Sequence, residues 1–223
     1  DEGVSAHEDS EITFTNSVIR ECDNGMNHVQ NVKSVTRNIY IADCRNNGIE
    51  FQGGKNCRHS VENAVLVNNR VQMTWRSYST EPIILKNILG VSYGKRQALV
   101  MLSGKSVFEN MTLIAPAMRF NFRGQTSLSL KNAIFYVPKM EFDFRKRPLE
   151  FLTLSGVEIP ANTVLHNAYR NREPFIKAGK TGLKTLSLTS PFSVAGAIKQ
   201  LCGQPVGAPK SLYKVYQQNN RKQ

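Results

Sequence analysis

A short turn motif recurs along this chain every twenty-odd residues and limits the folds open to it. In each copy a strand-like apolar run leads into Asn, Asp or Gly. The turn residues are Asn16, Asp43, Asn63, Asn87, Asn110, Asn132 and Gly156. Their successive separations are 27, 20, 24, 23, 22 and 24 residues. A period of this length indicates a solenoid, in which each unit buries its apolar face against its neighbours.

The residues around the turns favour β-structure in each coil. Asn, Asp and Gly tolerate left-handed backbone geometry, and stacked amides can hydrogen-bond along a column. A second apolar run follows each turn, and a third run alternates between apolar and polar residues, as in 71–75, 118–122 and 140–144. Strict alternation places one face in the core and the other in water. The sequence therefore predicts an all-β, right-handed parallel β-helix of seven to eight coils.

Other repeat and sheet folds fit the pattern less well. An α-solenoid would need longer segments with 3.6-residue periodicity, and a leucine-rich repeat would need regularly spaced Leu. An antiparallel β-sandwich is the main competitor, because it also has short alternating strands. Its turns would not be expected to recur with the same chemistry.

The chain divides into three predicted segments. Residues 1–190 form the β-helix, which we expect to be the C-terminal part of a longer solenoid, because no start methionine or cap precedes the first strand-like run. Residues 191–203 form a short helix that caps the stack, with Ser190 as its N-cap, Pro191 at its first position and Gly203 after its end. Residues 204–223 are expected to be an extended basic tail.

Composition adds an expectation about partners. The net charge of +12 favours an anionic partner, and acidic polysaccharide, nucleic acid and anionic lipid all fit. No run of 18 apolar residues predicts a membrane span, and no leader segment is recognisable. The four cysteines are too few and too irregularly spaced for a disulfide framework or a paired zinc motif, so buried free thiols are expected.

The repeated coils, from Val4 to Leu188, resemble the right-handed β-helix proteins of the pectate-lyase-like superfamily. The first nine residues are also similar to the acidic "D-D-G-x-S-x-H" stretches of β-helix polysaccharide hydrolases, with Glu2 where a second Asp is expected. The resemblance implies a substrate groove across one sheet, lined by outward side chains of successive coils. It also implies a secreted, periplasmic or cell-surface protein.

The alternating strands supply the candidate substrate-binding residues. Those expected to face outward are Glu50, Gln52, Gln72, Thr74, Arg76, Arg119, Asn121 and Arg123, continued by Glu141, Asp143 and Arg145. Their arginines could pair with uronate carboxylates or sulfate esters. The alternative is an ordinary solvated sheet face. Trp75 follows the inward parity and is expected in the core.

The first segment holds the densest set of titratable groups, and these are the candidate catalytic residues: Asp1, Glu2, His7, Glu8 and Asp9. Paired carboxylates could serve glycoside hydrolysis, and His7 could take the proton in a β-elimination. The same oxygens could hold Ca²⁺, although no cofactor is required. The alternative is a solvated acidic surface.

Two functions remain open at this stage. One is a carbohydrate-active protein that acts on an acidic polysaccharide by hydrolysis or β-elimination. The other is a non-catalytic β-helix that binds glycans or mediates adhesion. Nucleic acid is a distant third partner, since no recognised motif or outward aromatic platform is present. The oligomeric state is left open.

Overall fold

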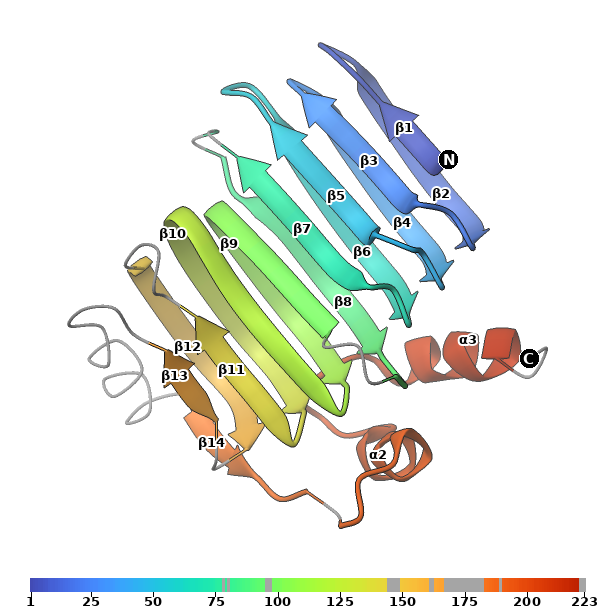
Figure 1. Ribbon diagram of the computed structural model, residues 1–223, viewed down its shortest axis with the longest axis vertical. Coiled ribbons are helices and arrows are strands. Elements are labelled where there is room, and N and C mark those ends of the chain that lie inside the picture. The colour runs from blue at the N-terminus through green and yellow to red at the C-terminus, as the bar shows by residue number, and fades with distance from the viewer. Residues whose placement is uncertain are drawn as a thin grey trace.

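Every pairing among the described strands of the computed structural model is parallel, and strands pair from one coil to the next. The structure describes residues 1–77, 79, 81–94, 98–143, 149–160, 163–166, 183–188 and 190–220. The strands form a β-solenoid of about six turns, where the sequence predicted seven to eight coils. The predicted parallel β-helix is thereby confirmed (Figure 1).

The strands build two faces of the solenoid, here called sheet A and sheet B. Sheet A contains β1 (Glu2–Ala6), β3 (Asn24–Gln30), β5 (Asn47–Gly53), β7 (Val71–Ser77), β11 (Lys139–Asp143) and β13 (Val164–His166). Sheet B contains β2 (Glu11–Arg20), β4 (Lys33–Ala42), β6 (Arg58–Val67), β8 (Ile83–Val91), β12 (Leu149–Pro160) and β14 (Leu183–Leu186). The long strands β9 (Ala98–Ile114) and β10 (Ala117–Tyr136) run through both sheets.

An amide ladder runs along the middle of sheet B. Its members adopt positive φ angles of 52° to 58° and are Asn16, Asn38, Asn63, Asn87, Asn110 and Asn132. Each side-chain nitrogen donates to the amide oxygen of the preceding coil, at 2.8 to 3.2 Å. Gly156, with φ of +61°, continues the column. This column of asparagines and Gly156 bends β2, β4, β6, β8, β9, β10 and β12 at equivalent positions.

The prediction was wrong for one residue of this column. Asp43 does not lie in the ladder, and Asn38 takes its place. Asp43 also has a positive φ, but it belongs to a second turn column at the end of sheet B, where its carboxylate accepts a hydrogen bond of 3.0 Å from Asn68. The first three coils carry a second left-handed turn, at Glu21, Asp43 and Asn68, so the residue type alone did not separate the two columns.

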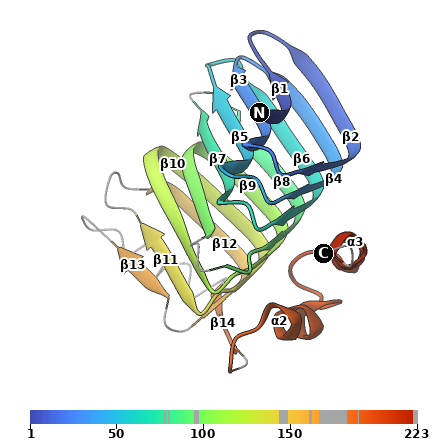
Figure 2. The same ribbon diagram turned by 45° about the vertical axis from the view of Figure 1, so that its right-hand side comes forward.

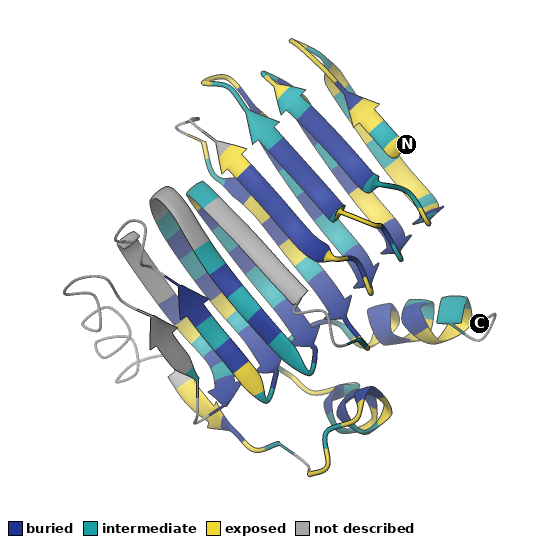
Figure 3. Ribbon diagram, in the orientation of Figure 1, coloured by how far each residue is buried: buried dark blue, intermediate teal, exposed yellow. Residues whose placement is uncertain are grey.

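The interior of the solenoid is apolar and aromatic, as the alternation predicted. Figure 3 shows the buried residues along the strands of both sheets. Trp75 is buried in the core, and its indole Nε1 donates to Ser106 Oγ at 2.7 Å. Phe120 and Phe142 stack on adjacent coils with ring centroids 5.2 Å apart. All four cysteines are free, and Cys44 and Cys57 are buried.

Two helices cover the outer surface of sheet B beyond the ladder (Figures 1 and 2). Helix α2 (Val194–Leu201) begins after Ser193, whose side chain caps Gly196 N, so the predicted cap at Ser190 was wrong by one turn. Helix α3 (Lys210–Asn220) occupies the segment predicted as an extended tail, and that prediction was also wrong. Both helices pack along the side of the solenoid because its surface there is apolar, with Tyr40, Val65 and Leu89 against them.

Candidate functional site

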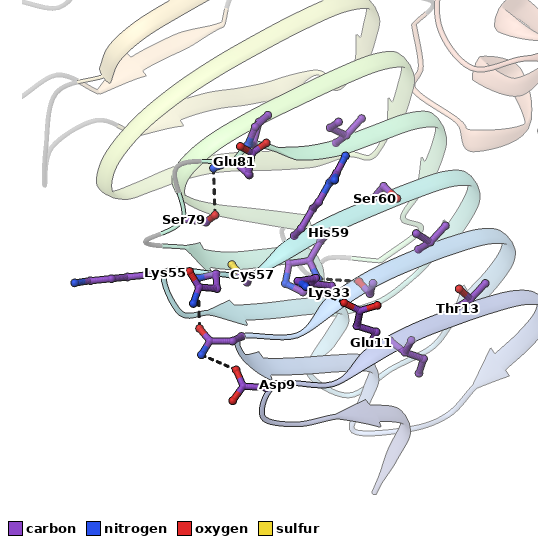
Figure 4. Close-up of a pocket in the computed structure, with 18 residues that line it drawn as sticks. Asp9, Glu11, Thr13, Lys33, Lys55, Cys57, His59, Ser60, Ser79 and Glu81 are labelled. Carbon is purple, nitrogen blue, oxygen red and sulfur yellow. Dashed lines mark hydrogen bonds and ion pairs between the residues drawn. The ribbon is translucent and has the colours of Figure 1, made fainter.

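A groove of about 1040 Å³ crosses the beginnings of four strands of sheet B (Figure 4). Its floor is formed by one row of side chains from β2, β4, β6 and β8: Thr13, Val35, Ser60 and Ile84. One wall is formed by the turns that lead into these strands, with Asp9, Asn31, Asn56, Ser79 and Glu81. The groove is therefore built from equivalent positions of successive coils.

In-register pairing explains why these side chains gather. Thr13 pairs with Val35, Val35 with Ser60, and Ser60 with Ile84. Neighbouring strands lie about 4.8 Å apart, so equivalent residues stack into a row along the solenoid axis. A second row, two residues earlier in each strand, contains Glu11, Lys33 and Arg58.

The charged groups of the groove are unevenly paired. Lys33 Nζ lies 2.8 Å from Glu11 Oε1, and this hydrogen bond lowers the pKa of the Glu11 carboxyl. Arg58 is exposed and makes no ion pair with any described residue. Lys55 lies on the rim and points away from the groove (Figure 4). Arg58 is thus a cation whose charge is available to a ligand.

Two histidines lie in the core directly behind this part of sheet B. Phe51 stacks on both, with its ring centroid 4.2 Å from that of His59 and 5.1 Å from that of His28, and the two imidazole rings are 5.8 Å apart. Burial lowers the pKa of His59 to about 3 and that of His28 to about 4. His59 Nδ1 and Ser34 Oγ are 2.7 Å apart, whereas both nitrogens of His28 lack a partner among the described groups. These imidazoles are neutral at neutral pH and belong to the interior.

The five candidate catalytic residues of the first segment do not converge on one point. The amino group of Asp1 pairs with the carboxylate of Asp23, and the carboxylate of Glu2 accepts a hydrogen bond from Asn27. A hydrogen bond from Ser5 is the largest cause that lowers the pKa of Glu2.

The other three candidates lie in the turn after β1. His7 Nε2 lies 2.6 Å from Ser5 Oγ. Glu8 is exposed in a turn with φ of +52°. Asp9 accepts a hydrogen bond of 2.9 Å from Asn31 and is the only one of the five that lines the groove.

The outer face of sheet A carries a hydrogen-bonded amide and carboxylate network. Glu50 is only 9% exposed, and its carboxylate accepts hydrogen bonds from Asn47 Nδ2 at 2.7 Å and Gln52 Nε2 at 2.9 Å. Thr74 is buried, and its hydroxyl donates to Asn47 Oδ1 at 3.0 Å. Arg76, on the same strand as Thr74, is exposed. The carboxylate of Glu50 and the hydroxyl of Thr74 are therefore both engaged within the protein, through Asn47.

The outward orientation predicted for Gln72 was wrong. Its side chain is fully buried, and its Nε2 donates to the carbonyl of Val91 at 3.1 Å and to Ser92 Oγ at 2.8 Å. Gln72 and the next residue, Met73, are both inaccessible, so the alternation does not hold at the start of β7. Asn69, in the bend that leads into β7, also donates to Gln72 Oε1 at 3.0 Å, so the Gln72 side chain is held at this bend.

Further along sheet A, one of the predicted arginines is neutralised within the protein. Arg119 Nη2 lies 2.7 Å from Glu141 Oε2 on the next strand. Asn121 is half-buried, and it lies opposite Asp143 of the neighbouring strand in the sheet register. The side chain of Arg123 and the whole of Arg145 lie outside the described residues. Sheet A therefore offers less free positive charge, at the positions described, than the sequence predicted.

Sequence reasoning missed the groove on sheet B. A signal was present, because a polar or charged residue opens each strand at Glu11, Lys33 and Arg58, and the second residue after it faces outward. The more regular alternation of the sheet A strands drew the prediction to the other face. No three His, Cys, Asp or Glu side chains in the described ranges gather closely enough to hold a metal ion.

Fold and groove together define a parallel β-solenoid protein with an open, charged groove on one sheet. No family model matches the chain, and no match to it is found among the curated proteins or the solved structures. Neither described helix is long and apolar enough to cross a membrane.

Proposed function

We propose that this protein binds an acidic polysaccharide in the groove of sheet B. The observation that carries the proposal is Arg58, an exposed cation that lines the groove and has no ion pair among the described residues. The net charge of +12 supports an anionic ligand, because a positive field raises the local concentration of polyanions. The resemblance of the coils to the pectate-lyase-like superfamily is consistent with this class of ligand, and with a secreted or surface location.

The groove residues suit a glycan. The planar guanidinium of Arg58 can hold a carboxylate or sulfate through two parallel hydrogen bonds. Thr13, Ser60 and Asn56 offer hydroxyl and amide groups for sugar hydroxyls. Ile84, at 40% exposed, offers an apolar surface for the C–H face of a sugar ring.

Cleavage of the bound chain is a second candidate, favoured by the carboxylates Asp9, Glu11 and Glu81 in the same groove. Glycoside hydrolysis uses two carboxyl groups, one as acid and one as base or nucleophile. Lys33 holds Glu11 in its ionised form, which fits the base or nucleophile. Asp9 or Glu81 would then supply the proton to the leaving group.

Binding is tested by calorimetry with polygalacturonate and chondroitin sulfate at two salt concentrations. Arg58→Glu should weaken binding by about tenfold or more, because a cation that meets the ligand becomes an anion. Arg70→Glu makes the same charge change at an exposed position outside the groove and should leave the affinity within about twofold. Equal losses in both variants, or no binding by the parent protein, would refute the proposal.

The same samples test cleavage. If the groove is catalytic, new reducing ends or unsaturated products accumulate with the parent protein and are lost in Glu11→Gln. Binding without products, in both proteins, would leave the non-catalytic function.

A further inference from the structure

The floor of the groove continues beyond the groove along the outer face of sheet B. Ile84 pairs with Val107 on β9, and Val107 pairs with Ser129 on β10. The row thus spans six coils and consists of Thr13, Val35, Ser60, Ile84, Val107 and Ser129. Each of these side chains is small or aliphatic, and each is at least partly exposed. We call this row the track.

Charged residues flank the track on the ladder side, where they neutralise one another. They stand two residues after the track in each strand and alternate in sign: Arg37, Glu62, Lys86, Glu109 and Lys131. Arg37 Nε lies 3.6 Å from Glu62, while Glu109 lies 3.9 Å from Lys86 Nζ and 3.1 Å from Lys131 Nζ. All the charges of this side are engaged in ion pairs.

The opposite side of the track carries two cations that have no ion pair with a described residue, beside the exposed carboxylate of Glu81. Arg58 stands two residues before Ser60, and Lys105 stands two residues before Val107. Both are exposed, and neither has an ion pair within the described part of the chain. In the coil between them the equivalent position is Pro82. The two cations are therefore two strand spacings apart, which corresponds to about 10 Å.

From this asymmetry we infer that the acidic glycan lies along the solenoid axis, over the whole track, with its acidic groups turned toward Arg58 and Lys105. This inference rests on the proposed function and extends the site beyond the groove. The six strands that carry the track are separated by five intervals of about 4.8 Å, so its end residues lie about 24 Å apart. That length accommodates about five rings of an extended pyranose chain, so the ligand is a polymer segment and not a mono- or disaccharide.

The experiment measures affinity against chain length, with oligogalacturonates and chondroitin sulfate fragments from disaccharide to octasaccharide. Affinity should rise with each added unit and level off at about five to six sugar residues, when the track is full. Lys105→Glu should weaken hexasaccharide binding by about tenfold and change trisaccharide binding by less than about twofold, because short chains need only the groove around Arg58.

The control is Lys139→Glu, which makes the same charge change at an exposed position at the start of β11 on sheet A. It should leave both ligands unaffected. Affinity that levels off at the trisaccharide, with Lys105→Glu silent, would overturn the inference and leave the proposed function intact. A loss of equal size in Lys139→Glu would show that only overall charge matters and would also overturn it. Absence of any binding, by contrast, would refute the proposed function as well.

Discussion

Asn63 shows how single residues hold adjacent coils in register. It adopts a φ of +58°, donates to Asn38 at 2.9 Å and accepts from Asn87 at 2.8 Å. Asn tolerates this backbone region better than other residues that carry a Cβ atom. The position therefore requires both the left-handed backbone and the amide.

Substitutions at Asn63 should separate the two requirements. Asn63→Ala loses the ladder hydrogen bonds and strains the backbone, so the free energy of unfolding should fall by about 2 to 3 kcal/mol. Asn63→Gly removes only the amide and should cost about 1 kcal/mol. Chemical denaturation measures both. Asn46→Ala, at an exposed position outside the ladder, should change stability by less than about 0.5 kcal/mol. Equal stability of the Ala and Gly variants would contradict the role of the backbone.

The sequence identified most of the ladder because left-handed turns demand few residue types. Asn16, Asn63, Asn87, Asn110, Asn132 and Gly156 were all placed correctly. Asp43 was misplaced because it satisfies the same local demand in another column. Local chemistry thus predicts the kind of turn, while the column to which it belongs depends on pairing between coils.

At the scale of elements, helix α3 seals an apolar strip of sheet B. Leu212, Tyr213 and Tyr216 are buried against the strands. The carbonyl of Asn219, near the helix end, accepts a hydrogen bond of 2.9 Å from Arg20 on β2. The sequence did not predict this helix, because it is short and its surface lysines dominated the pattern. Its apolar residues became informative only once the strip beneath them was known.

Leu212→Glu should detach this helix. It buries a charge without a partner and removes apolar contacts, so unfolding should become easier by about 3 kcal/mol or more. Binding of a hydrophobic dye should rise as the strip is exposed. Lys214→Glu introduces the same side chain on the exposed side of the helix and serves as the control. If the two variants behaved alike, α3 would not be docked in solution as it is in the structure.

For the whole molecule, the stack of His28, Phe51 and His59 ties stability to pH. The folded-state pKa values, about 4 for His28 and about 3 for His59, lie below the ordinary value of 6.5. At pH values between the folded-state and the ordinary pKa of each histidine, the unfolded chain binds more protons than the folded chain does. The contribution that these two histidines make to the free energy of unfolding at neutral pH is therefore lost as the pH falls from about 6.5 toward 3.

His28→Phe should remove part of this dependence. The parent protein should lose about 2 to 3 kcal/mol through His28 alone between about pH 7 and pH 4, and the variant should not. Urea denaturation at a series of pH values measures the difference. His7→Gln removes an exposed histidine that contributes only the smaller cause of the lowered His28 pKa, so it should change the parent's curve much less than His28→Phe does. An identical acid loss in His28→Phe would show that carboxylates, and not this buried ring, set the acid limit.

The candidate site was less predictable than the fold. Outward orientation held for Gln52 and Arg76 but failed for Gln72, because a bend interrupts the alternation there. Arg119 was expected to be free for a ligand and pairs with Glu141. Whether a surface charge is free depends on its neighbour one coil away, and a single strand pattern does not contain that information.

The ladder also determines where the solenoid can change length. Successive ladder residues are 22, 25, 24, 23 and 22 positions apart, yet the rungs stay aligned. Two of the three residues by which the interval grows from 22 to 25 fall in one bend. Gln30 pairs with Gly53 and Lys33 pairs with Arg58, so an interval of three positions becomes one of five. That bend forms the rim of the groove. Insertions there can reshape the groove while the hydrogen-bonded scaffold stays unchanged, so the preference of the proposed ligand site can diverge between related chains without loss of the fold.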